Sequence, residues 1–220
     1  MILLSVDTSG STGSLALARC DGTKVLSLDQ LAWTKKAMHS EVATVELQKL
    51  LSKTKVELPQ LTHLAVNVGP GSFTGLRVGI SLVKTLAYSL GLAVCSLNTL
   101  EILAFLKTTP GDRALIATKA VQNFFYAATF ERTSTGVKVE HEPESHEGPG
   151  LAALAGGRTK VLIEGETAGF SPATEARDLV EMLAASGFSL TFSDWKSVQP
   201  LYLRASEAEE KLKKGLLKPV

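Results

Sequence analysis

One stretch of fourteen residues constrains the fold of this chain more than any other, because it joins a strand to a helix through a glycine-built turn. The stretch covers residues 67–80 and reads NVGPGSFTGLRVGI. Glycines permit positive φ and a close approach of another backbone, and the hydroxyl side chains that follow them are good helix N-caps. The pattern predicts a buried strand over 63–68, a tight turn and a helix over 74–90.

A helix that begins after glycines is a ready site for an anion, so the first functional question is whether this turn is a phosphate loop. A P-loop requires lysine and then serine or threonine after its last glycine, whereas leucine and arginine follow Gly75. The dinucleotide fingerprint G-x-G-x-x-G does not fit either, because after Gly69 and Gly71 its third glycine would fall at position 74 and not at Gly75. Ser72 is not in a nucleophile elbow, because Pro70 and Thr74 occupy the places of its glycines. The P-loop, the dinucleotide fingerprint and the nucleophile elbow are therefore excluded. The simplest alternative is that the turn only connects a strand to a buried helix.

The helix predicted over 74–90 has more apolar surface than one sheet can cover. Its polar side chains form a narrow strip, whereas a one-sided surface helix needs an apolar arc of only about 100°. Gly75 and Gly79, four residues apart, predict a shallow notch where a second helix could come close. We therefore predict that this helix docks onto a partner. We also expect that Gly79→Glu abolishes association and leaves the fold intact.

A second helix, predicted over 40–53, also has spare apolar surface. Its leucines fall on one face, while Met38, Val42 and Val45 form a second, smaller apolar edge. We expect the two helices to form one docking surface, which the free protein would bury as a homodimer. The residues predicted to form this surface are His39, Val42, Val45, Gly71, Ser72, Phe73, Thr74, Gly75, Arg77, Val78, Gly79, Leu82 and Leu86.

The composition excludes several classes of function. Of the 220 residues, 45% are hydrophobic and 20% are charged, and the formal net charge is +1. This is an ordinary soluble composition, without global basicity that would indicate nucleic-acid binding. No apolar run reaches the roughly 18 residues of a membrane span, and the N-terminal segment predicts a strand and not a signal peptide. We expect Cys20 and Cys95 to be buried, reduced thiols of a cytoplasmic protein.

Neither a metal centre nor a peptidase is predicted. The chain has 4 histidines, and no two of them are spaced by four residues. His141 and His146 fall in a charged segment, where we expect them to be solvated. Ser72 has no recognisable histidine and aspartate partners for nucleophilic catalysis. We therefore expect no catalytic residue and no bound metal.

The order of the predicted elements indicates an α/β fold. Strands over 2–6, 14–19 and 24–31 precede an alternation of helices and strands, which implies a mixed sheet with helices on its faces. This layout is similar to the ribonuclease-H-like half shared by actins, Hsp70 proteins and sugar kinases. We divide the chain into a ribonuclease-H-like N-terminal domain, 1–107, and a reduced second α/β domain, 108–220. The second domain is expected to contain a polar linker over 142–150, a strand-like segment over 201–203 and a charged C-terminal tail.

The turn after the first strand is a second candidate site. In proteins with this layout, that turn contacts nucleotide phosphates, and a carboxylate at the end of the first strand handles the metal. The corresponding residues here are Asp7, Thr8, Ser9, Ser11 and Thr12. A small ATPase or kinase that binds ATP and Mg²⁺ through this turn is therefore the main alternative function. The simplest opposing explanation is that these residues are good turn formers.

Several motifs, in order along almost the whole chain, resemble those of the TsaB family, also called YeaZ. They are Asp7–Ser9, His39–Glu41, Gly69–Arg77 with Val78–Ile80, Asn98–Glu101 and Pro200–Arg204. The long glycine motif is the most specific of these. The chain departs from the family pattern at Lys119, where relatives typically have an aspartate before an aromatic strand.

The resemblance implies a non-catalytic subunit that docks through its first two helices onto TsaD, for threonylcarbamoyl transfer to adenosine 37 of tRNA. It also implies that the TsaE ATPase joins a larger complex, that tRNA contacts this chain indirectly, and that no membrane is involved. No resident cofactor is expected, and any ATP and Mg²⁺ would lie at the junction with the partner. The lysine-rich tail beyond Ser206 would add nonspecific attraction to tRNA.

Overall fold

A computed structural model describes residues 1–34 and 39–203, except for the side chain of His39. The predictions for the charged tail and for Met38 lie outside the described residues. No helix in the described ranges is long and apolar enough to cross a membrane. The strands are β1 (Ile2–Asp7), β2 (Thr12–Asp21), β3 (Lys24–Thr34), β4 (His63–Asn67), β5 (Val94–Leu97), β6 (Arg113–Lys119), β7 (Phe124–Arg132), β8 (Val137–Glu147), β9 (Lys160–Ile163) and β10 (Phe192–Ser193).

The α-helices and short 3-10 helices complete the architecture. The α-helices are α1 (His39–Thr54), α2 (Phe73–Leu90), α3 (Thr99–Lys107), α4 (Leu151–Ala155) and α5 (Ala176–Ala185). The 3-10 helices are η1 (Leu58–Gln60), η2 (Gly148–Gly150) and η3 (Trp195–Ser197). The predicted order of elements through the third helix is confirmed.

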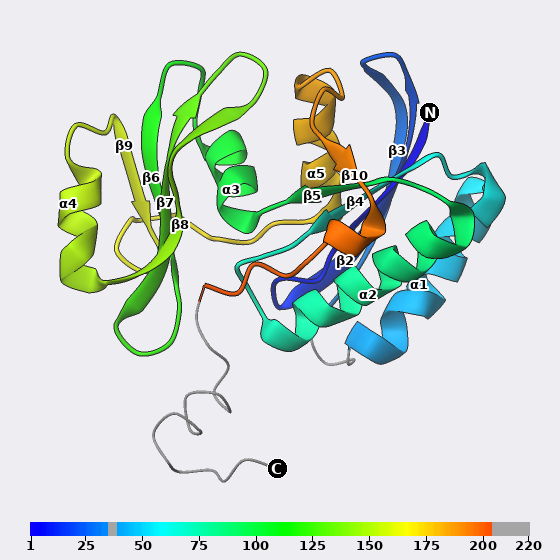
Figure 1. Cartoon of the computed structure of the whole chain (residues 1–220), viewed down its shortest axis with the longest axis horizontal. Coiled ribbons are helices and arrows are strands. Elements are labelled where there is room, and N and C mark those ends of the chain that lie inside the picture. The colour runs from blue at the N-terminus through cyan, green and yellow to red at the C-terminus, as the bar shows by residue number, and fades with distance from the viewer. Residues whose placement is uncertain (35–38, 204–220) are drawn as a thin grey trace, which may run out of the picture.

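Two sheets organise the described part of the chain (Figure 1). The first has the strand order β10-β5-β4-β1-β2-β3, in which β1 is parallel to β4 and antiparallel to β2. The second has the order β8-β7-β6-β9. The central order β5-β4-β1-β2-β3, with helices on both faces, is that of the ribonuclease-H-like half of an actin-like α/β fold. The predicted fold class is therefore confirmed.

Helices cover both faces of the first sheet, which explains why its central strands are continuous apolar runs. Leu4 and Val6 of β1 pack in a core cluster with residues of α1 and α2. Leu3, which points to the opposite face, packs in a second cluster with residues of α5. Every residue of β1 from Leu3 to Asp7 is consequently buried.

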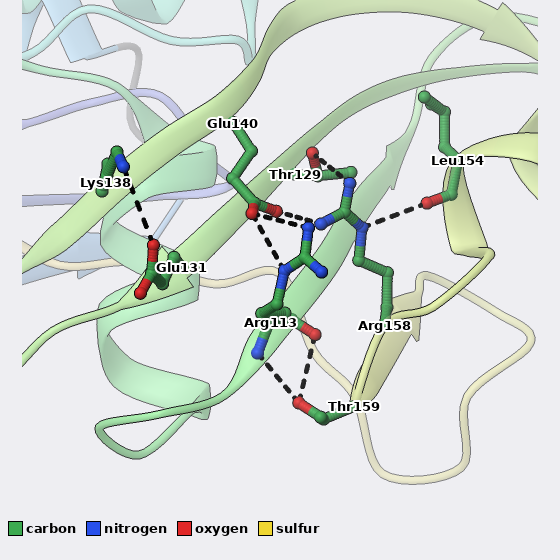
Figure 2. Close-up of polar contacts among 8 residues, drawn as sticks. All are labelled: Arg113, Thr129, Glu131, Lys138, Glu140, Leu154, Arg158 and Thr159. Carbon is green, nitrogen blue, oxygen red and sulfur yellow. Dashed lines mark hydrogen bonds and ion pairs between the residues drawn. The ribbon is translucent and has the colours of Figure 1, made fainter.

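The second sheet is covered by a helix on one face and partly by charged side chains on the other. α3 packs on the first of these faces, and the five-residue helix α4 covers part of the second. Beside α4, Arg113 and Arg158 converge on Glu140 (Figure 2). Arg158 also donates to Leu154 O at 3.4 Å and to Thr129 Oγ1 at 3.2 Å. The long arginine side chains thus cover strand surface that a longer helix would otherwise cover.

The chain returns to the first sheet after the second is complete. α5 packs on β1, β2 and β4, and β10 pairs antiparallel with β5. The predicted division after residue 107 falls between α3 and β6. By sheet membership, however, residues 176–203 of the predicted second domain belong with the first sheet.

Two boundary predictions are corrected by strand pairing. The linker predicted over 142–150 is wrong for most of its length, because β8 continues to Glu147 and pairs with β7. A register shift in that ladder, near Pro143, marks a bulge, which is where a strand tolerates proline. β3 likewise continues to Thr34, beyond the strand predicted over 24–31, because Trp33 packs in the core.

Candidate functional site

The glycine turn forms the start of α2, as predicted. Gly69 has a φ of 102°, a conformation that favours glycine. Ser72 is the N-cap, and its Oγ accepts a hydrogen bond from Gly75 N at 3.3 Å. Among the hydroxyl side chains that follow the glycines, the cap is Ser72 and not Thr74, because the helix begins at Phe73.

The turn that follows β1 lies directly against this helix start. Thr8 Oγ1 donates a hydrogen bond to Gly75 O at 2.7 Å, and Ser72 N donates to Ser9 O at 2.6 Å. A Cβ at Gly75 would overlap the carbonyl oxygen of Thr8, and a Cβ at Gly79 would overlap Thr8 Oγ1. Both helical glycines therefore face the chain's own turn.

This geometry corrects the role predicted for the two glycines. The notch expected to admit a partner helix is filled by Thr8 of the same chain. The expectation that Gly79→Glu leaves the fold intact is contradicted for the same reason, since a glutamate side chain has no room there. The periodicity of one helix shows that a small residue is needed, but not which neighbour it faces.

A buried carboxylate, Asp7, ties the turn to other segments of the chain. Its Oδ1 accepts hydrogen bonds from the backbone N and the hydroxyl of Ser9, at 2.9 and 2.7 Å. Its Oδ2 accepts from Asn67 Nδ2 at 3.0 Å and from Thr174 Oγ1 at 2.6 Å. Asn67 Oδ1 in turn accepts from Gly69 N at 2.9 Å. The network therefore joins the ends of β1 and β4 to the segment that leads into α5.

The same network bears on the predicted nucleotide site. Of its residues, Asp7, Thr8 and Ser9 are buried, whereas Ser11 is exposed and Thr12 is half-buried. Each oxygen of Asp7 already accepts two hydrogen bonds from the protein, so the carboxylate has no free acceptor position to offer a metal ion. The geometry assigns the turn a structural role. Nucleotide binding stays a prediction, and the burial of Asp7 counts against it.

The residues predicted for the docking surface separate into buried and exposed sets. Gly75, Gly79 and Leu86 are buried within the chain, so their assignment to a partner surface is corrected. Gly71 is exposed, but a Cβ on it would overlap Ser9. The side chain of His39 lies outside the described residues. The residues that stay at least partly exposed are Val42, Val45, Ser72, Phe73, Thr74, Arg77, Val78 and Leu82.

The exposed side of α2 has a crest of small side chains. Thr74, Val78, Ser81 and Thr85, which we call the crest, are spaced by four, three and four residues, so they lie along one line of the helix. Thr85 Oγ1 donates to Ser81 O, and Ser89 Oγ donates to Thr85 O, both at 2.8 Å. Because the helix itself satisfies the hydroxyl of Thr85, another helix could cover this end of the crest without leaving that hydroxyl unpaired.

One flank of α2 is covered by the chain's own C-terminal segment, residues 194–203, which we call the strap. In Figure 1, α2 lies between α1 and the strap, which is drawn in orange to red. Lys84 Nζ donates to Val198 O at 3.1 Å, and Leu201 N donates to Val68 O at 2.8 Å. The strand-like segment predicted over 201–203 thus follows α2 without forming a strand. The strap accounts for part of the wide apolar arc predicted for this helix.

Comparison with known proteins shows which families this chain resembles in sequence. Residues 34–140 match the family model of TsaD, tRNA N6-adenosine threonylcarbamoyltransferase. The "tRNA threonylcarbamoyladenosine biosynthesis protein TsaB" of Bacillus subtilis (strain 168) is 36% identical over 104 residues, which are 47% of this chain and 44% of the relative. The protein of the same name from Escherichia coli (strain K12) is 29% identical over 147 residues, 66% of this chain and 62% of the relative. The chain is thus similar to proteins of the TsaB family.

The fold comparison extends further along this chain than the sequence comparison does. The chain spans about half the length of the curated relatives it matches, with 44% of the B. subtilis protein covered. The solved structure of "YeaZ from Pseudomonas aeruginosa" superposes with a TM-score of 0.68 at 21% sequence identity and covers 92% of this chain and 99% of that one. The match shows that both chains have the same fold.

Burial shifts the pKa values of two groups in the core of the first sheet. Burial raises the pKa of Asp178 to about 6, and the carboxylates of Glu181, Glu175 and Asp7 add to the shift, although the hydrogen bond donated by Glu175 N opposes it. Burial also raises the pKa of the Cys95 thiol to about 12. The prediction of buried, free thiols is confirmed for both cysteines.

The two histidines of β8 differ from the expectation made for them. Their rings lie 6.0 Å apart, and the side chain of His146 is only 20% exposed, so the prediction that it is solvated is wrong. β8 holds it there by pairing with β7, which the linker prediction missed. Among the described side chains, no group of three His, Cys, Asp or Glu residues could hold a metal ion.

Sequence reasoning missed the position of the strap. The segment Pro200–Arg204 resembled a family motif, but its pattern did not show that it would lie on α2. Tyr202 stacks on Phe73 with ring centroids 4.9 Å apart, and Arg77 Nε donates to the Tyr202 hydroxyl at 3.0 Å. Two motifs that are far apart in the sequence thus form one surface.

Proposed function

We propose that this chain is an accessory subunit in the biosynthesis of tRNA threonylcarbamoyladenosine. In this proposal it pairs with a TsaD-family threonylcarbamoyltransferase through α1 and the crest of α2, and the chemistry takes place on that partner. The names of its TsaB relatives support a role in this modification. The observation that carries the proposed surface is the crest, a line of small, uncharged and at least partly exposed side chains along α2.

The apolar side chains beside the crest are suited to such a contact. Val45 of α1 is 46% exposed and Phe73 at the start of α2 is 39% exposed, while Val42 and Leu82 are half-buried between core and solvent. α1 and α2 pack side by side on one face of the first sheet. Two adjacent helices can supply a standard interface, which buries about 1,600 Å² in total.

The similarity to TsaD supports a partner of that family. The TsaD match begins at residue 34 and so includes α1 and α2. Two proteins that share these helices can pair them about an approximate two-fold axis, as identical subunits do in an isologous dimer. The same surface would form a homodimer when the chain is alone, so the homodimer and the heterodimer should exclude each other. We further propose that the TsaE ATPase joins the heterodimer and that tRNA is held mainly by the partner.

The test is copurification of the untagged chain with the tagged TsaD-family protein of the same organism. Val45→Glu and Ser81→Trp should each weaken the complex at least tenfold, because a charge or a large ring would stand in the helix contact. Val121→Glu is the matched control, since Val121 is 58% exposed in the turn between β6 and β7, in the second sheet. Circular dichroism should show that all three variants are folded.

Two outcomes would contradict the proposal. In the first, folded Val45→Glu and Ser81→Trp variants bind the TsaD-family protein as tightly as the wild-type chain does. In the second, a reconstituted threonylcarbamoylation assay proceeds at the same rate without this chain. ATP turnover by the chain alone, lost on Asp7→Asn, would favour the alternative ATPase instead.

A further inference from the structure

A second surface of α2 combines exposed aromatic rings with cations. It is formed where the strap lies along the helix, and we call it the aromatic flank. It differs from the crest in chemistry, because the crest has neither a ring nor a charge. Its members are Phe73, Arg77, Lys84 and Tyr88 of α2 and Trp195, Lys196 and Tyr202 of the strap.

One end of the aromatic flank lies near the C-terminus of α2. Tyr88 meets Trp195 edge to face, with ring centroids 5.4 Å apart. The ammonium groups of Lys84 and Lys196 each lie 5.7 Å from the Trp195 ring centroid. Tyr88 is 71% exposed, more than any other large hydrophobic side chain in the described residues. A mostly exposed ring is therefore held in place beside two cations.

The other end lies at the N-terminus of α2 and repeats this combination. Tyr202 stacks on Phe73 with an angle of 29° between the ring planes. The guanidinium carbon of Arg77 lies 3.9 Å from the Phe73 ring centroid. Phe73 and Tyr88 are fifteen residues apart, so the flank is about 22 Å long at 1.5 Å per residue.

The charge of the aromatic flank is positive. α2 contains no aspartate or glutamate, and within the strap the only carboxylate is Asp194, which accepts a hydrogen bond from Lys196 N at 2.8 Å. No salt bridge within the described residues involves Arg77, Lys84 or Lys196. Three cations thus lie along the flank without a carboxylate paired to their side chains.

We propose that the aromatic flank binds an unpaired segment of RNA. Single-stranded nucleic acids are bound by aromatic rings on which bases stack, combined with cations that follow the phosphates. Here Tyr88 and Tyr202 offer partly exposed rings, while Lys196 and Arg77 offer the cations. A length of about 22 Å suits the shorter single-stranded sites, which take roughly four nucleotides or more. This goes beyond the proposed function, in which tRNA contacts the chain through the partner.

The composition of the flank favours RNA over a protein ligand. Lysine is depleted in the centres of protein interfaces, whereas two lysines of this flank lie beside Trp195, the ring that Tyr88 contacts. The uncharged surface of small or apolar side chains that suits a protein helix is found instead at the crest and at Val45. Phe73 and Arg77 lie close to that docking surface, so the test below uses Tyr88 and Lys196.

The experiment is fluorescence anisotropy of a labelled, unstructured twelve-nucleotide RNA titrated with the full chain at two salt concentrations. Tyr88→Ala should weaken binding by about fivefold or more, because the stacking of one base on one aromatic ring raises the affinity by at least about fivefold. Tyr88→Phe should bind within about twofold of wild type, since it keeps the ring. Lys196→Glu should weaken binding and lower the salt dependence of the affinity, because a phosphate contact is lost.

Lys49→Glu is the matched control, because Lys49 is an exposed lysine on α1, away from the strap. It should change RNA affinity much less than Lys196→Glu does. The inference is overturned if the wild-type chain does not bind the RNA, or if Tyr88→Ala binds it as wild type does. It is also overturned if Tyr88→Ala impairs copurification with the TsaD-family protein and leaves RNA affinity unchanged, which would make the flank a protein surface. None of these results affects the tests at Val45 and Ser81.

Discussion

The two sheets of this molecule cover their faces by different means. The first sheet has helices on both faces that pack apolar side chains against it, and buried polar residues such as Asp7 and Ser5 are hydrogen-bonded within the chain. The second has α3 on one face, but its other face is covered by the short helix α4 and by the cluster of Arg113, Arg158 and Glu140 (Figure 2). A sheet face without a long helix can therefore be covered by ion-paired arginines. Because the first sheet has the more completely buried core, we expect substitutions there to lower the free energy of unfolding more than substitutions at the second sheet do.

The largest effect is expected at Gly79, where α2 touches the turn of the first sheet. Gly79→Glu should lower the free energy of unfolding by about 4 kcal/mol or more, because the side chain would displace Thr8 and separate the helix from β1. Ser81→Glu, two residues along the same helix but exposed, should change it by about 0.5 kcal/mol or less. Urea denaturation followed by circular dichroism measures both. Equal effects at the two positions would refute the inward-facing assignment of the glycine.

A smaller loss is expected when the buried network of the first sheet is broken. Asp7→Asn replaces one acceptor oxygen with a donor, so Asn67 or Thr174 loses its acceptor in a buried site. We expect a destabilisation of about 2 kcal/mol, the usual range for a stranded buried polar group. Asp21→Asn, at the exposed end of β2, should be nearly neutral. If ATP and Mg²⁺ raise the Tm of the wild type but not of Asp7→Asn, the network is a ligand site after all.

The cluster of the second sheet should be less sensitive than the core of the first. Glu140→Gln removes the charge shared by Arg113 and Arg158, which would leave two guanidiniums facing one neutral amide. Because the cluster is partly exposed, the expected loss is about 1 kcal/mol. Glu131→Gln is the control, since its ion pair with Lys138 is 3.9 Å long and exposed. A loss at Glu140 as large as that at Gly79 would abolish the contrast between the sheets.

The smallest effect should depend on pH and concerns Asp178 at the start of α5. Burial raises its folded-state pKa to about 6, above an unfolded value of about 4. The folded state therefore binds the proton more tightly, so the stability that this group contributes falls as pH rises from about 4 to about 6. Asp178→Asn keeps an oxygen to accept from Glu175 N and should melt about 1–3 °C higher than wild type at pH 7.5.

The same comparison at pH 4 completes this test. The wild-type carboxyl is largely protonated there, so the two melting temperatures should nearly coincide. A thermal shift series from pH 4 to 7.5 measures the difference. A constant gap between Asp178→Asn and wild type across this range would contradict the raised pKa.

Much of the first sheet could be predicted from local patterns. The strand, turn and cap around Ser72 were predicted because their signals, glycines and a capping hydroxyl, lie within a few residues of one another. The linker prediction failed at Pro143, where the bulge that accommodates the proline depends on β7, a separate strand. Polar and proline-rich composition indicates a loop only where no strand is available for pairing.

The sequence by itself showed that α2 is more apolar than one sheet requires and that Gly75 and Gly79 leave room for a close neighbour. The neighbours themselves are visible only in the tertiary structure. Thr8 contacts the glycines, and Tyr202 of the strap contacts Phe73. The physical reason is that helical periodicity fixes the angular position of a side chain about one axis. The identity of the neighbour depends on how segments far apart in the chain pack together, which no local pattern records.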